Sequence, residues 1–197
     1  MAAELLKSWQ APALVSTVEI DASAKRVADA KRTKVSGLKT GDEISWTQLD
    51  EALPMPVDLN DPVVALAVRS SDFVQALNQH TLKVTGLGAA NYSLKIDGEE
   101  VGSLTKEQLA EGINLATLPT PMAKQAAEVH KLTVQHNNVH FQRWRQIQVP
   151  LAEGKTPKVQ EAVKSLMAAL DDEETGVVQQ QRAAAQPNPH QFQLVPK

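Results

Sequence analysis

The chain has 197 residues, and its 42% hydrophobic and 22% charged residues are typical of a globular protein. With 20 basic against 23 acidic residues the net charge is −3, so neither nucleic acid nor an anionic membrane is expected as a partner. The absence of cysteine excludes disulfides, thiolate metal sites and a cysteine nucleophile. Neither a signal peptide nor a run of about 20 apolar residues is found, and the compartment stays open because an export signal could lie upstream of Met1.

The first twelve residues have the pattern of an amphipathic helix without a beginning. Leu5, Leu6 and Trp9 share one side, no capping residue precedes them, and Pro12 ends the pattern. We therefore expect residues 1–12 to be the terminal helix of an upstream domain that is missing here. Whether Met1 is the true start is left open.

A β-rich module with an inserted helix is expected over residues 13–116. Asp61-Pro62 starts the inserted helix, with a capping acid followed by proline. Asp97-Gly98 is typical of a tight hairpin, and Thr105 with Gln108 forms a capping box before a short helix. Alternating or extended segments predict strands at 14–20, 33–38, 43–48, 81–85, 91–96, 99–104 and 113–115.

A long helical pair is expected over residues 117–186, followed by an extended tail over 187–197. The first helix runs to about Arg145, and the alternation from Ile147 to Leu151 predicts an exit strand. Thr156-Pro157 starts the second helix, whose apolar stripe consists of Val159, Val163, Leu166 and Leu170. The fold class is therefore α+β: a small β-rich module followed by a long helical pair.

Polar side chains interrupt the apolar face of the first long helix. A polar group buried in such a face needs a hydrogen-bond partner on the element opposite. The polar seam is defined by Thr133, His136, Asn137, His140, Arg143 and Trp144. Two interpretations stay open: satisfied side chains between two packed elements, or one wall of a ligand pocket or domain interface. Trp144 lies on the apolar stripe, so a core position is its simpler interpretation, and Arg143 could reach a carboxylate.

The sequence lacks the common nucleotide-binding and catalytic motifs. The sequence has no P-loop, no dinucleotide-binding fingerprint and no Gly-x-Ser-x-Gly, so no catalytic or cofactor-binding residue is predicted. His136 and His140 have a spacing at which two histidines can share a metal, but no third ligand accompanies them, and no metal is expected. Trp46 and Tyr92 could form a sugar-stacking platform, although core positions are the simpler interpretation.

Three stretches of the chain resemble one family. They are LLKSW-x-APALVSTVEID near the start, QQRAAAQPNPHQFQLVP near the end, and GEEVGSLTKEQLAEGINLATLPTPMAKQAAEVHKLTVQHNNVHFQRWRQIQVPL between them. Together they resemble the C-terminal region of bacterial GDSL-type (SGNH) hydrolases over nearly the whole chain. Such enzymes hydrolyse esters in an α/β domain that carries Gly-Asp-Ser, Gly-x-Asn-Asp and Asp-x-x-His motifs, none of which this sequence contains.

The resemblance implies a non-catalytic portion of a GDSL-type esterase. It would pack on the upstream hydrolase domain, its partner, and shape the cleft for an ester or carbohydrate substrate. Two other hypotheses stay open. One is a stand-alone carbohydrate- or protein-binding module, which exposed Trp46 and Tyr92 would favour. The other is a metal-dependent enzyme that uses His136 and His140.

Overall fold

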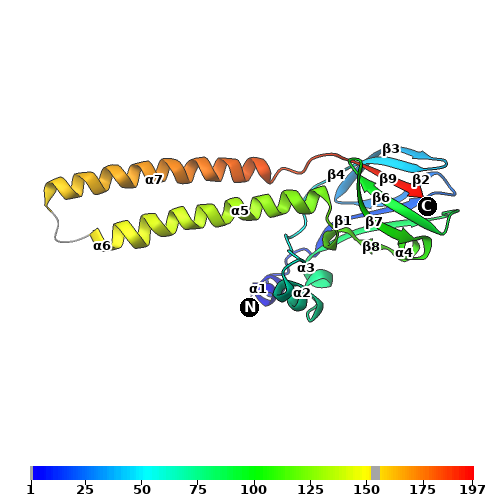
Figure 1. Cartoon of the computed structure of the whole chain (residues 1–197), viewed down its shortest axis with the longest axis horizontal. Coiled ribbons are helices and arrows are strands. Elements are labelled where there is room, and N and C mark those ends of the chain that lie inside the picture. Colours follow the sequence, from blue (N-terminus) through cyan, green and yellow to red (C-terminus); the bar gives the residue numbers. More distant parts are fainter. Residues whose placement is uncertain (1, 152–155) are drawn as a thin grey trace. The chain divides into compact units, whose positions relative to one another are not determined.

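The computed structural model describes residues 2–151 and 156–197, so Met1 and its status as the start lie outside the described residues. It divides into two compact units (Figure 1). The first unit comprises the residues up to Ala126 together with Pro187–Lys197, and the second comprises Ala127–Gln186. The fold class is α+β, a small β-rich module followed by a long helical pair, as the sequence predicts. Among the described helices, none combines the length and the apolarity that crossing a membrane requires.

Two sheets form the first unit. One has the order β2-β1-β5-β8 and is built from Arg26–Lys31, Leu14–Asp21, Gln79–Thr85 and Ile113–Asn114. The other has the order β3-β4-β9-β6-β7 and is built from Thr33–Thr40, Ile44–Asp50, His190–Pro196, Asn91–Ile96 and Glu99–Thr105. β1 and β5 pair in parallel, whereas the other described pairs are antiparallel.

The core of the first unit lies on alternating residues of these strands. Trp46 and Phe192 are the largest fully buried side chains, and their rings stack at a centroid distance of 5.1 Å. Aliphatic residues from both sheets surround them, including Ile20, Leu82, Leu94 and Leu194. The strand period of two sends these residues inward and their polar neighbours outward, as in the burial pattern of β4.

Short helices flank the sheets. They are α1 (Ala2–Ser8), α2 (Pro62–Arg69), α3 (Phe73–Leu77), α4 (Lys106–Glu111) and the 3₁₀ turn η1 (Leu115–Thr117). The expected caps are present: Asp61 accepts from the backbone N–H groups of Val63 and Val64, and Thr105 forms its capping box with Gln108. The expected helix after Asp61 is interrupted between Arg69 and Phe73.

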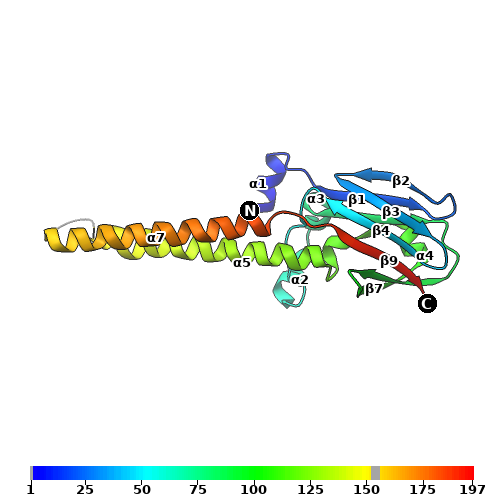
Figure 2. The same cartoon turned by 90° about the horizontal axis from the view of Figure 1, so that it is seen from above.

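The second unit is a helical pair. α5 (Pro121–Phe141) continues into a π-helical stretch η2 (Gln142–Gln148) and the short α6 (Val149–Leu151), and α7 (Pro157–Ala184) runs back beside it (Figures 1 and 2). The exit strand expected from Ile147 to Leu151 is wrong, because these residues are helical. Pro150 offers no N–H to the preceding turn, and the N–H of Val149 bonds to the carbonyl of Trp144, five residues back.

Two strands differ from the sequence-based expectation. β2 was not expected, because Arg26–Lys31 is polar and mostly exposed, which is typical of an edge strand without a buried face. The final residues, expected only as an extended tail, form β9 between β4 and β6. Phe192 and Leu194 in this strand are fully buried, so the end of the chain completes the core.

Candidate functional site

The polar seam meets one carboxylate on the opposite helix. His136 Nε2 lies 2.8 Å and His140 Nδ1 lies 3.0 Å from the same oxygen, Oε1 of Glu174 on α7. The two histidines are four residues apart on α5, so they lie on one helix face, and their ring centroids are 6.4 Å apart. Partial burial raises the pKa of Glu174, but the hydrogen bonds from His140 and His136 outweigh it and hold that pKa below its usual value.

The remaining seam residues divide into bonded and exposed ones. Arg143 forms a forked ion pair with Asp171 through Nε and Nη2, and this pair raises the pKa of the guanidinium. Thr133 donates to the carbonyl of Val129 at 2.8 Å and accepts from Gln181 Nε2 at 2.5 Å. Asn137 is exposed.

Trp144 is also exposed, with Arg145 5.7 Å above its ring. Within the second unit the seam therefore consists mainly of interhelical hydrogen bonds. Across residues 2–151 and 156–197, no group of three or more histidine or acidic side chains could hold a metal ion.

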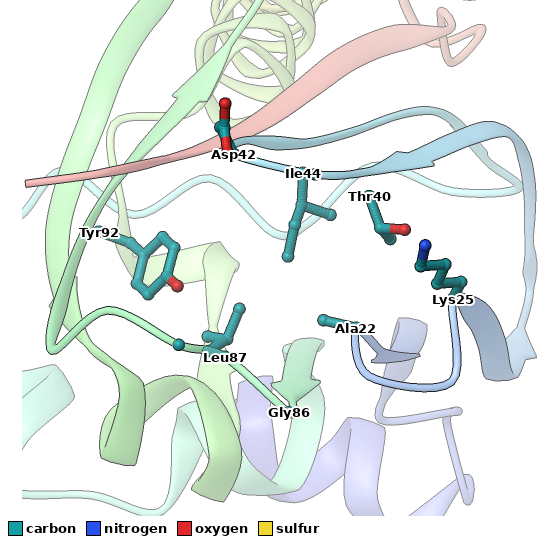
Figure 3. A pocket seen from close by; sticks show the side chains of 10 residues that line it. Ala22, Lys25, Thr40, Asp42, Ile44, Gly86, Leu87 and Tyr92 are labelled. Atoms are coloured by element: carbon teal, nitrogen blue, oxygen red, sulfur yellow. The ribbon is translucent and has the colours of Figure 1, made fainter.

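A pocket opens where three turns of the first unit meet (Figure 3). The turns join β1 to β2, β3 to β4 and β5 to β6, and the cavity between them measures about 190 Å³. We call it the turn pocket. It is lined by Ala22, Lys25, Thr40, Gly41, Asp42, Ile44, Gly86, Leu87, Gly88 and Tyr92. Sequence reasoning missed it, because these residues come from three turns whose meeting depends on the sheet order.

The turn pocket has a mixed lining whose accessible surface is more polar than apolar. Ile44 and Tyr92 are buried, and the ammonium group of Lys25 lies near the side chain of Thr40 (Figure 3). The Tyr92 hydroxyl accepts a hydrogen bond from the backbone N–H of Ala89 at 3.0 Å, which fixes the ring. Lys25 has no ion-pair partner among the described residues. A small molecule that carries polar groups matches this lining better than a purely apolar one.

Gly86 brings two of the turns together. Its φ of +73° lies in the left-handed region that favours glycine, and a Cβ there would come 2.7 Å from the backbone nitrogen of Ser23. The close approach of the β5–β6 turn to the β1–β2 turn therefore requires glycine at this position. At Gly88, which also lines the pocket, an added Cβ would meet no heavy atom within 4 Å.

A chain of buried polar groups crosses from one sheet to the other. Trp46 Nε1 donates to Gln48 Oε1 at 3.2 Å, and Gln48 Nε2 donates to Asp50 Oδ1 at 2.8 Å. The other oxygen of Asp50 lies 3.0 Å from His80 Nε2, close but poorly aligned for a hydrogen bond. Burial raises the pKa of Asp50, but His80 and Gln48 outweigh it and keep that pKa below its usual value.

Ser16 lies beside His80 on the neighbouring parallel strand. The register of β1 and β5 pairs the two residues, so Ser16, His80 and Asp50 have the residue types of a hydrolytic triad. Both Ser16 and His80 are fully buried, and the hydroxyl of Ser16 has no hydrogen-bond partner among the described residues. A substrate cannot reach these atoms, so we assign the group to the core and not to catalysis.

One solved structure is similar over nearly the whole chain, a gut microbial diltiazem-metabolizing enzyme. The alignment covers 93% of this chain at 25% identity with a TM-score of 0.76. This chain spans 50% of that protein's length. No family model and no curated protein matches.

This comparison corrects the expected family. The assignment to the C-terminal region of GDSL-type (SGNH) hydrolases is wrong, because the structural match is to a protein described as a diltiazem-metabolizing enzyme. The comparison likewise gives no support for describing the chain as a piece of an esterase. The stretches that suggested the family carry helix caps, hairpin turns and apolar stripes, which specify folding and not chemistry.

The functional expectations change as well. A non-catalytic esterase portion is overturned by the similarity to an enzyme, and so is the stand-alone binding module. Burial speaks against the binding module independently: Trp46 is 1% and Tyr92 5% exposed, so neither offers a stacking face. What the chain shares with its structural neighbour is the fold over 93% of this chain.

Proposed function

We propose that this chain forms part of an enzyme that transforms small organic molecules, and that the turn pocket holds one end of the substrate. The similarity over 93% of the chain to a diltiazem-metabolizing enzyme carries the first half of the proposal. Because the chain spans half of that protein, the activity of the whole neighbour is itself a proposal here.

The lining of the turn pocket supports the second half. Small-molecule sites are concave and use a few polar groups to fix the orientation of the ligand. The turn pocket is concave, and its accessible lining is more polar than apolar. Ala22, Ile44 and Leu87 supply the apolar wall, and Lys25 and Thr40 supply polar atoms (Figure 3). A cavity of about 190 Å³ is smaller than the roughly 300–1,000 Å³ typical of drug-sized ligands, so only one end of such a molecule would enter.

Ligand-observed NMR with diltiazem as the probe tests the pocket. We expect saturation transfer from the purified chain to the drug. Thr40→Trp should abolish it, because an indole at the end of β3 fills the cavity. Lys34→Trp, on an exposed part of the same strand and outside the lining, serves as the matched control.

The two variants separate the outcomes. Loss of transfer in Thr40→Trp with retention in Lys34→Trp supports the turn pocket. Equal transfer in both variants would contradict it, and so would the absence of transfer from the unmodified chain.

A further inference from the structure

The outer half of the helical pair leaves large apolar side chains half exposed. Within α5 and α7, Leu132, Val139 and Val177 are buried, with exposures of 7%, 6% and 4%. Val134 on α5 is 44% exposed, and five large apolar side chains closer to α6 are 38% to 51% exposed. These outer residues are Phe141, Trp144, Val149, Val159 and Leu166, and we call them the hairpin patch.

Two of these exposed residues lie on the face of α7 that is directed toward α5. Val159 and Leu166 share the stripe that also contains Val177, which is buried. Two helices alone cannot cover such a stripe, since each contacts only one neighbour. In a four-helix bundle each helix packs against two neighbours, and the stripes close around a common core.

We infer that the hairpin patch binds a second copy of this chain, with two helical pairs side by side in antiparallel orientation as a four-helix bundle. Half of a large aromatic side chain exposes on the order of 100 Å², and half of a branched aliphatic one somewhat less, so the patch exposes roughly 400 Å² per chain. A stable dimer buries about 800 Å² per partner, a little over half of it apolar. The patch therefore matches the apolar part of such an interface.

Charge along the pair specifies the orientation. Within the part of the chain that the structure describes, the outer end carries Arg145, Lys158 and Lys164 against one acid, Glu161, and the middle of α7 is acidic from Asp171 to Glu174. Among the described residues, Arg145, Asp172 and Glu173 have no ion-pair partner. An antiparallel arrangement places the basic end of one copy over the acidic stretch of the other, whereas a parallel one places like charges together.

The π-helical stretch lies within this surface. It is seven residues long and displays Trp144, half exposed, beneath Arg145. π-Helical turns are rare and occur frequently at functional sites. The aromatic residues Trp and Tyr, together with Arg, are also the residue types that contribute most binding energy to protein interfaces.

Sedimentation equilibrium of the full chain tests the inference. We expect a dimer whose dissociation constant rises about tenfold or more in the double variant Trp144→Ala, Leu166→Ala, since each truncation removes a half-buried anchor. The control is Val63→Ala, Leu66→Ala on α2, where the side chains are 73% and 62% exposed. It should leave the dissociation constant unchanged, and far-UV circular dichroism should show the same helix content in all three proteins.

Charge reversal tests the orientation without touching the apolar residues. Arg145→Glu and Glu173→Arg should each weaken the dimer, and the two changes together should restore it. A monomeric unmodified chain would overturn the inference. So would a dimer that is weakened by the α2 control and not by the patch variant. Failure of the paired reversal to restore association would overturn the antiparallel arrangement.

Discussion

Replacing Asp50 with alanine should destabilise the chain more than any surface change. Asp50 is 6% exposed, accepts from Gln48 at 2.8 Å, and lies 3.0 Å from His80 Nε2. Its removal leaves the buried Gln48 amide without its acceptor and takes the carboxylate away from His80 Nε2. Leaving a buried polar group without its partner typically costs about 1–3 kcal/mol, a substantial part of the roughly 5–15 kcal/mol by which domains are stable.

The pH dependence of folding stability gives a second, independent test of the role of Asp50. Because the pKa of Asp50 is lower in the folded chain than its ordinary 3.8, the carboxylate stabilises the fold above pH 3.8. That contribution is lost as the pH falls through the lower folded value. Asp50→Asn keeps the shape and removes this titration, so its stability curve should be flatter in the acid range.

Urea unfolding followed by the fluorescence of Trp46 measures both effects. Trp9 and Trp144 are exposed and can be replaced by Phe to leave Trp46 as the single reporter. Asp42→Ala is the matched control: Asp42 is exposed and lacks an ion-pair partner among the described residues, and it should change stability by less than about 0.5 kcal/mol. A loss of stability below about 1 kcal/mol for Asp50→Ala would refute the contribution of the Asp50 contacts with Gln48 and His80.

Three further predictions concern other parts of the molecule. Gly86→Ala should cost about 2 kcal/mol or more, since it strains a φ of +73° and forces a Cβ to within 2.7 Å of Ser23, whereas Gly88→Ala should be nearly neutral in the same thermal unfolding experiment. Ser16→Ala should leave stability unchanged or raise it slightly, because the buried hydroxyl has no partner among the described residues; a loss above about 1 kcal/mol would show that it does. Glu174→Gln should weaken the helical pair by about 1 kcal/mol at neutral pH. The Glu174 contribution is present above pH 4.5 and fades as the pH falls through its lowered pKa, so circular dichroism of the variant and the unmodified chain should converge in acid.

Local signals in the sequence predict much of the fold. The Asp97-Gly98 hairpin, the Thr105 capping box and the Asp61 cap depend on residues within a few positions of each other, and the structure confirms them. β2 escaped prediction because a polar edge strand has no apolar alternation. The place of β9 could not be predicted either, since insertion between β4 and β6 is a long-range choice.

In the candidate site, too, local features could be predicted from the sequence and long-range contacts could not. Helical periodicity identified the polar residues of α5, but their partner Glu174 depends on the relative rotation of two helices, which no local pattern specifies. The pairing of Ser16 with His80 joins strands 64 positions apart through a parallel register. The turn pocket likewise depends on three turns that meet only in the folded chain.

Turnover of diltiazem by the purified chain tests the proposed function most directly. Mass spectrometry of a reaction time course would follow the loss of the parent drug and the appearance of a product of different mass. We expect the loss to scale with protein concentration, to be absent from a heat-denatured sample, and to fall in Thr40→Trp while it persists in Lys34→Trp. Loss of the drug at the same rate with native and denatured protein, or no loss at all, would contradict the proposal.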